Sequence, residues 1–158
     1  MAQMTDPTPA LKSFQHHLRL GNLLPQPGEL DRQIHVHLDD ANGKPRFTYV
    51  TLDRQTVTAL VMLVFVDRKD GAPCFQIGYA VPPAYRRQGL AQKAVHAAIA
   101  ELRHGLARTG VTRLSIEAVV GLDSVASQHV AAATLSAKPT QITDSVSGLP
   151  ALYYCRSF

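Results

Sequence analysis

The chain has 158 residues, of which 46% are apolar, so it is long enough for one domain with a substantial core and too short for two. Its formal net charge of +4 favours an anionic partner. The basic residues are scattered without a Lys/Arg block or interleaved aromatic residues, and tryptophan is absent, which argues against nucleic-acid binding.

The longest apolar run covers residues 59–66, which is far shorter than a membrane span, and the first ten residues lack the layout of a signal peptide. We therefore expect no membrane association and a cytoplasmic location. Cys74 and Cys155 both fall in predicted strands, where cysteine usually behaves as a small apolar residue. They indicate neither a disulfide framework nor a zinc site.

The N-terminal third predicts a helix followed by a hairpin. We expect residues 1–9 to form a flexible lead and residues 10–158 to form a single domain, which begins with an amphipathic helix over 10–20. Residues 31–38 alternate apolar and polar side chains as a strand does, and Asn42-Gly43 favours a tight turn into a second strand.

His35 and His37 share one side of the first predicted strand, which raises the question of a metal site. The simpler interpretation is that both histidines face solvent. Two imidazoles are fewer ligands than zinc takes in structural or catalytic sites. We expect no metal site. The apolar run over 56–66 then predicts a long central strand.

The most informative stretch runs from residue 74 to residue 106. Residues 74–81 predict a buried strand that ends at Pro82, and apolar positions at helical spacing from Leu90 to Leu106 predict a helix lying on the sheet. Gly89 stands where this helix begins. Its first turn would leave backbone N–H groups available to an anion, so the sequence predicts a phosphate site.

The remaining residues predict a strand over 111–120, a helix over 121–135 and a closing hairpin over 141–146 and 149–158. The strand carries Glu117 among apolar neighbours. Ser124 or the residue before it would begin the helix as its N-cap.

The segment Arg86-x-x-Gly89-x-Ala91, between a hydrophobic strand and an amphipathic helix, resembles the Q/R-x-x-G-x-G/A signature of the GNAT superfamily of acetyl-CoA-dependent N-acetyltransferases. The resemblance covers residues 46–158. It implies an α/β fold with a mixed, mostly antiparallel sheet of six to seven strands, a splayed central parallel pair and flanking helices. In the family, two helices follow the first strand, whereas here a hairpin is predicted in their place.

The same resemblance implies a set of cofactor-binding residues. The diphosphate of acetyl-CoA would lie on the N–H groups of the turn before and into the helix, and Arg86 would add charge. The pantetheine would pair with the edge of the predicted strand, where family members carry a bulge that polarises the thioester carbonyl. The implied residues are Ala80, Val81, Arg86, Arg87, Gln88, Gly89, Leu90, Ala91, Ser124 and Ser127.

For catalysis, the resemblance implies Glu117 as the base, since its place in SIEAVV resembles that of a catalytic glutamate in the ribosomal-protein N-terminal acetyltransferase branch. The helix tyrosine that commonly protonates the leaving thiolate is absent. Tyr154, its neighbour Tyr153, and Ser127 or His129 acting through water are the candidates for that role.

The leading hypothesis is therefore transfer of an acetyl group to a primary amine by direct transfer in a ternary complex. Two alternatives stay open: a module that binds coenzyme A or an acyl-CoA without turnover, and an interaction domain that uses only the fold. Gln76 stands where family members often carry a second carboxylate, which motivates the first alternative. The exposed edge of the predicted hairpin favours a homodimer.

Overall fold

The computed structural model describes residues 7–158, so most of the predicted N-terminal lead lies outside the described residues. One mixed sheet carries the fold in the strand order β1-β2-β3-β4-β5-β6-β8-β7. Its strands are β1 (Gln26–Pro27), β2 (Ile34–Ala41), β3 (Lys44–Asp53), β4 (Thr56–Lys69), β5 (Ala72–Ala80), β6 (Ser115–Gly121), β7 (Thr140–Thr143) and β8 (Pro150–Ser157). The helices are α1 (Thr8–Arg19), α2 (Leu90–Ala107) and α3 (Val125–Thr134), and a single 3-10 turn, η1 (Pro83–Tyr85), precedes α2.

All neighbouring strands pair antiparallel except β5 and β6, which are parallel. The predicted mixed sheet with one central parallel pair is thus confirmed. The described residues form one strand more than the predicted six to seven, because Gln26 and Pro27 pair with β2 where the sequence indicated only a connection. A two-residue strand is too short to show a period-2 pattern.

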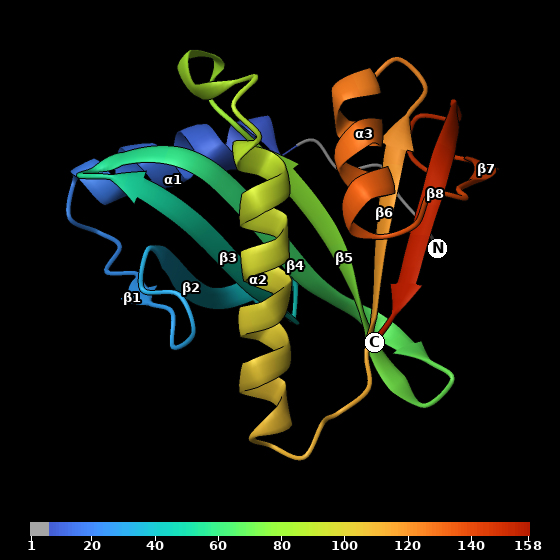
Figure 1. The fold of residues 1–158 in the computed structure, drawn as a ribbon, viewed down its shortest axis with the longest axis horizontal. Helices are drawn as coiled ribbons and strands as arrows, with labels where there is room; N and C mark the ends of the chain where they lie inside the picture. Colours follow the sequence, from blue (N-terminus) through green and yellow to red (C-terminus); the bar gives the residue numbers. More distant parts are fainter. Residues whose placement is uncertain (1–6) are drawn as a thin grey trace.

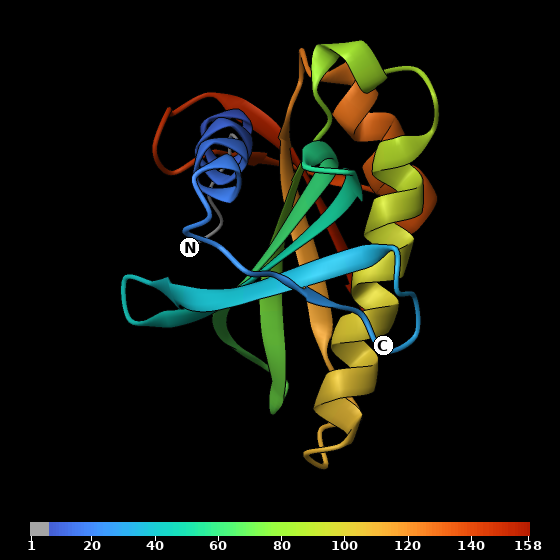
Figure 2. The same cartoon turned by 90° about the vertical axis from the view of Figure 1, so that its left-hand side faces the viewer.

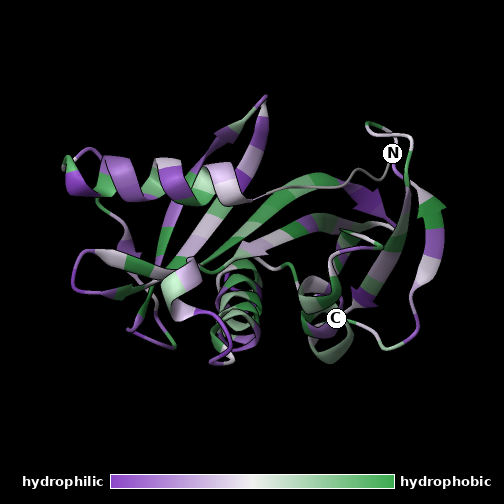
Figure 3. Ribbon diagram, turned by 90° about the horizontal axis from the view of Figure 1, so that it is seen from above, coloured by the Kyte–Doolittle hydropathy of each residue, from purple (hydrophilic) through white to green (hydrophobic). Residues whose placement is uncertain are grey.

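The helices cover the two faces of the sheet unequally (Figure 2). Helix α1 lies on one face, and α2 and α3 lie on the other. Leu11 and Phe14 of α1 pack against Val50, Leu60 and Met62 in a small core. The larger core lies beneath α2 and α3, and the view from above shows the sheet between these two layers (Figure 3).

Helix α1 begins at Thr8, two residues before the predicted start. Pro9 lies in its first turn, where a backbone nitrogen needs no intrahelical partner. The face of β2 that carries His37 meets this helix: the rings of Phe14 and His37 lie 6.2 Å apart, edge to face. The interpretation of the strand histidines as fully solvent-facing is therefore wrong, since His35 and His37 are both half-buried.

Turn chemistry fixes the register of the β2–β3 hairpin. Asn42 and Gly43 both have positive φ, 56° and 84°, as a two-residue hairpin turn requires, and the Asp40 carboxylate accepts the Gly43 N–H at 2.6 Å. The predicted hairpin is confirmed, and it pairs residue for residue from Ile34 with Thr51 to Ala41 with Lys44.

The parallel pair β5–β6 is the feature that positions the candidate site. Its register contains only three pairs, from Cys74 with Ser115 to Gln76 with Glu117. Beyond Gln76 and Glu117 the two strands separate, so that they meet at one end and diverge towards the other (Figure 1). The diverging end lies beside the loop that leads into α2 and beside the start of α3.

Candidate active site

The loop before α2 presents the start of that helix to solvent. Gly89 is the N-cap residue with φ of 72°, and no side chain of the described residues caps the helix there. The first intrahelical bond runs from the Lys93 N–H to the Gly89 carbonyl at 3.1 Å. The N–H groups of the residues before Lys93 in this first turn therefore have no acceptor within the helix, at an end where the peptide dipoles favour negative charge.

Two arginines lie in this loop and behave differently. The Arg86 Nε donates to the Val81 carbonyl at 3.0 Å, which ties the loop to the end of β5. Arg87 has φ of 63°, a left-handed conformation that is costly for a residue with a side chain. Both side chains are exposed, so both can place positive charge near an anion at the helix start.

The gap between the diverging strands is crossed by Tyr79. Its hydroxyl donates to the Ser127 carbonyl in the first turn of α3 at 2.6 Å. Burial, followed by the nearby Tyr154, raises the pKa of Tyr79 well above its ordinary value, so the hydroxyl stays protonated. The sequence did not indicate Tyr79, because its contact with α3 depends on how two distant segments pack.

The bulge expected near Ala80 or Val81 is absent from the pairing of β5, which ends at Ala80. Strand β5 pairs with β4 without interruption from Phe75 to Ala80, and the register shift lies in β4 between Phe65 and Asp67. Beyond Gln76, however, the edge of β5 that faces β6 has no pairing with that strand. Such an edge offers N–H and C=O groups to an extended ligand.

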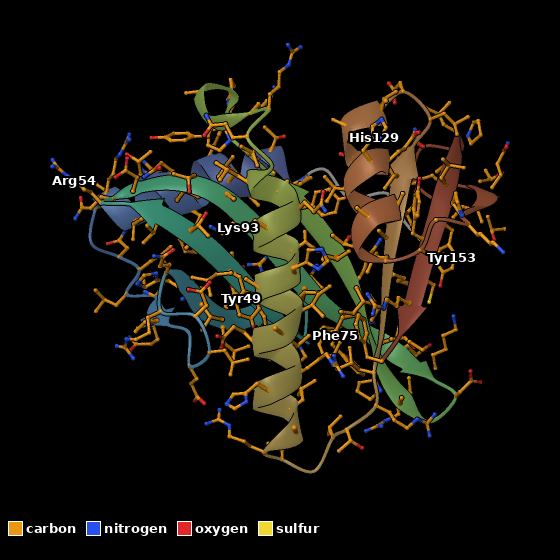
Figure 4. The ribbon with its side chains drawn as sticks, viewed as in Figure 1. Tyr49, Arg54, Phe75, Lys93, His129 and Tyr153 are labelled. Atoms are coloured by element: carbon orange, nitrogen blue, oxygen red, sulfur yellow. The ribbon has the colours of Figure 1, made fainter. Side chains whose placement is uncertain are left out.

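Helix α3 begins at the predicted residue, but the predicted N-cap hydrogen bond is not formed. Ser124 is the N-cap residue, yet its side chain makes no capping hydrogen bond. Instead the Gln128 amide donates to the Gly121 and Leu122 carbonyls at 2.9 and 3.0 Å. His129 lies on the exposed side of the same helix (Figure 4).

Glu117 lies on the opposite face of the sheet from α2 and α3. Its Oε2 accepts a hydrogen bond from the Tyr153 hydroxyl of β8 at 2.6 Å. Tyr154 pairs with Ala118, is 3% exposed and packs in the core beneath the helices. Tyr154, the predicted candidate to protonate the leaving thiolate, thus faces away from Glu117, because successive residues of a strand point to opposite faces.

The structure therefore separates the three predicted catalytic residues into two groups. Tyr154 and Ser127 both lie near Tyr79 on the helix-covered face. Glu117 lies across the sheet with Tyr153 and Cys74. Burial, followed by the Glu117 carboxylate, raises the pKa of the Cys74 thiol to about 12, so this thiol is protonated at neutral pH.

No helix among residues 7–158 combines the length and apolar content needed to cross a membrane. Over the same residues, no three side chains of His, Cys, Asp or Glu are grouped so that they could hold a metal ion.

The comparisons with known proteins agree with this geometry. A model of the acetyltransferase (GNAT) family matches residues 14–134, which is more than half of the chain. The chain therefore belongs to the GNAT acetyltransferase family. Within it, the start of α2 has no side-chain cap and lies beside the separating parallel strands β5 and β6. No curated protein matches the chain by sequence.

Solved structures of the same family share the fold. The GNAT acetyltransferase of Streptococcus pneumoniae has a TM-score of 0.54 at 11% identity, with 99% of this chain and 97% of that chain covered. The ribosomal-protein-S5-alanine acetyltransferase of Vibrio fischeri has a TM-score of 0.52 at 15% identity, over 72% of this chain and 61% of that one. An acetyl transferase of Salmonella typhimurium that modifies the N-terminal serine of ribosomal protein L7/L12 has a TM-score of 0.52 at 16% identity, over 72% and 64%.

At these identities the likeness shows the fold alone. The chain also spans less than two thirds of the length of the two ribosomal-protein acetyltransferases.

Proposed function

We propose that this chain transfers the acetyl group of acetyl-CoA to a primary amine, of a protein N-terminus, a lysine or a small molecule, by direct transfer in a ternary complex. The observation that carries the proposal is the uncapped start of α2 at the open end of the β5–β6 gap. A phosphate group and an extended thioester arm need these two features next to each other.

The N–H groups from Arg87 to Ala91 bind the diphosphate in this proposal, and the exposed Arg86 and Arg87 side chains add positive charge. The unpaired edge of β5 up to Ala80 and Val81 binds the pantetheine and brings the thioester towards the point where β5 and β6 meet. Ser124 and Ser127 face the same ligand from the start of α3. Gln88, Gly89 and Leu90 contribute backbone only.

Glu117 accepts the proton of the attacking amine. An ammonium group with a pKa of about 10.4 is mostly charged at neutral pH and must lose its proton before it can attack. The nitrogen–carbon bond then forms, the carbon–sulfur bond breaks, and the thiolate leaves with the bonding electrons. A thiol has a pKa of about 8.5, so the thiolate leaves without a strong acid.

The first acceptor to test is a protein N-terminus, because one of the structural neighbours is named for modifying the N-terminal serine of a ribosomal protein. Release of free thiol from acetyl-CoA should be measured with three acceptors: a peptide with a free N-terminus, an N-blocked lysine peptide and a small alkylamine. We expect release with at least one of them, and we expect Glu117→Gln to lower kcat/KM by about 100-fold or more.

The exposed Glu29→Gln variant is the matched control, since it makes the same change far from the gap, and it should keep full activity. Coenzyme A binding without thiol release on any acceptor would reduce the chain to a binding module. Equal activity of Glu117→Gln and the wild type would remove Glu117 as the base.

A further inference from the structure

A polar cluster on the face opposite α2 and α3 combines side chains from four strands. The cluster consists of Glu117 on β6, Tyr153 and Cys155 on β8, Lys69 at the end of β4, and Cys74 on β5. The Tyr153 hydroxyl donates to Glu117 Oε2 at 2.6 Å. The Lys69 ammonium donates to the Cys155 sulfur at 3.3 Å and lies 5.9 Å from the centre of the Tyr153 ring.

Within this cluster, the Tyr153 hydroxyl is the donor of its hydrogen bond to the carboxylate. Burial first, and then the hydrogen bond to Glu117, raise the pKa of Tyr153 far above its ordinary value. The phenol is therefore protonated throughout the neutral range. This bond holds Oε2 of the carboxylate from the β8 side, and the Cys74 thiol of β5 also hydrogen-bonds the carboxylate.

We propose that Tyr153 is a positioning residue that fixes the orientation of the Glu117 carboxylate, so that this carboxylate receives the proton of the acceptor amine. This inference rests on the proposed acetyl transfer for its catalytic meaning. The hydrogen bond itself stands on geometry alone, which makes the two separable by experiment.

Other groups also face Glu117 and bear on its titration. Cys74 and Gln76 approach it from β5, Cys155 approaches it from β8 beside Tyr153, and Lys69 brings the nearby positive charge. The hydrogen bond to Cys155 raises the pKa of Lys69, so its ammonium stays charged. Lys69 is unchanged in the variants below, so its effect on Glu117 cancels in the comparison.

The chain contains three glutamates, Glu29, Glu101 and Glu117, so the Glu117 side-chain carboxyl can be followed directly by NMR in protein labelled with ¹³C-glutamate. Its signal is assigned by its loss in Glu117→Gln. A hydrogen bond to a charged group accounts for about one pH unit or more of titration shift. We expect Tyr153→Phe to move the Glu117 midpoint upward by that amount, and the acidic limb of the kcat/KM profile to move with it.

Tyr154→Phe is the matched control, because it removes the same hydroxyl from the adjacent residue on the other face of the sheet. It should leave the Glu117 midpoint in place. Coincident midpoints in wild type and Tyr153→Phe would overturn the proposal, and so would a shifted midpoint with an unshifted rate profile. A shifted midpoint in a protein that acetylates no acceptor would support the coupling and overturn the proposed function instead.

Discussion

Arg87 shows how a single residue in the candidate phosphate loop departs from low-energy backbone geometry. Its φ of 63° costs about 1–2 kcal/mol for a residue with a β-carbon, and such outliers concentrate at functional sites. Arg87→Gly and Arg87→Ala both remove the guanidinium, but only glycine adopts this φ without strain. We expect Arg87→Gly to be the more stable variant by about 1 kcal/mol in urea unfolding.

Both variants should bind acetyl-CoA more weakly than the wild type, because the positive charge is lost in each. Equal stabilities of the two variants would show that Arg87 does not hold the left-handed conformation in solution.

At the same scale, the sequence indicated candidate residues of the site but not the contacts that they make. Glu117 and the loop from Arg86 to Ala91 were indicated by family resemblance, and their roles stay predictions. Tyr154 and its neighbour Tyr153 were named as candidates to protonate the leaving thiolate, but the bond between Tyr153 and Glu117 was not indicated, because only the register of β8 against β6 decides which tyrosine faces Glu117. A period-2 reading of β8 separates the two tyrosines but does not say which face carries the carboxylate.

Among the elements, α2 carries a buried carboxylate, Glu101, that ties it to a distant loop. Glu101 is 8% exposed and accepts the backbone N–H groups of Glu29, Leu30 and Asp31 at 3.0, 2.6 and 2.8 Å. This joins the helix to the loop between β1 and β2. A β-carbon on Gly28 would lie 2.7 Å from Glu101 Oε1, so the close approach requires glycine there.

We expect Glu101→Gln to lower the free energy of unfolding by about 2 kcal/mol, because charge-assisted hydrogen bonds in a buried site are replaced by weaker ones. Denaturant unfolding monitored by circular dichroism measures the change. Glu29→Gln is the matched control: Glu29 pairs with Arg108 and His104 at an exposed site, and its loss should cost less than about 1 kcal/mol. Similar losses in the two variants would contradict this role of Glu101.

For the whole molecule, local signals were sufficient to predict most elements and their order. Asn42-Gly43, the uninterrupted apolar run of β4 and the helical spacing of α2 each determine structure within a few residues. The short strand β1, the early start of α1 and the contact between Tyr79 and α3 depend on packing between distant segments. The separation of β5 from β6 was expected only from family resemblance, since no local pattern specifies where a parallel pair ends.

The measurement that tests the central claim most directly is the melting temperature with and without millimolar acetyl-CoA, for wild type, Gly89→Glu and Gly110→Glu. Both glycines have positive φ, 72° and 86°, and an added β-carbon would meet nothing within 4 Å at either, so the two variants carry equal strain and charge. Only Gly89 lies at the start of α2.

A ligand at 100 times its dissociation constant adds about 2.7 kcal/mol, which is a shift of several degrees for a domain of this size. The account predicts this shift for wild type and Gly110→Glu and its loss in Gly89→Glu, where a carboxylate repels the diphosphate. Equal shifts in all three proteins would contradict the assignment of the phosphate site, and no shift in the wild type would contradict acetyl-CoA binding itself.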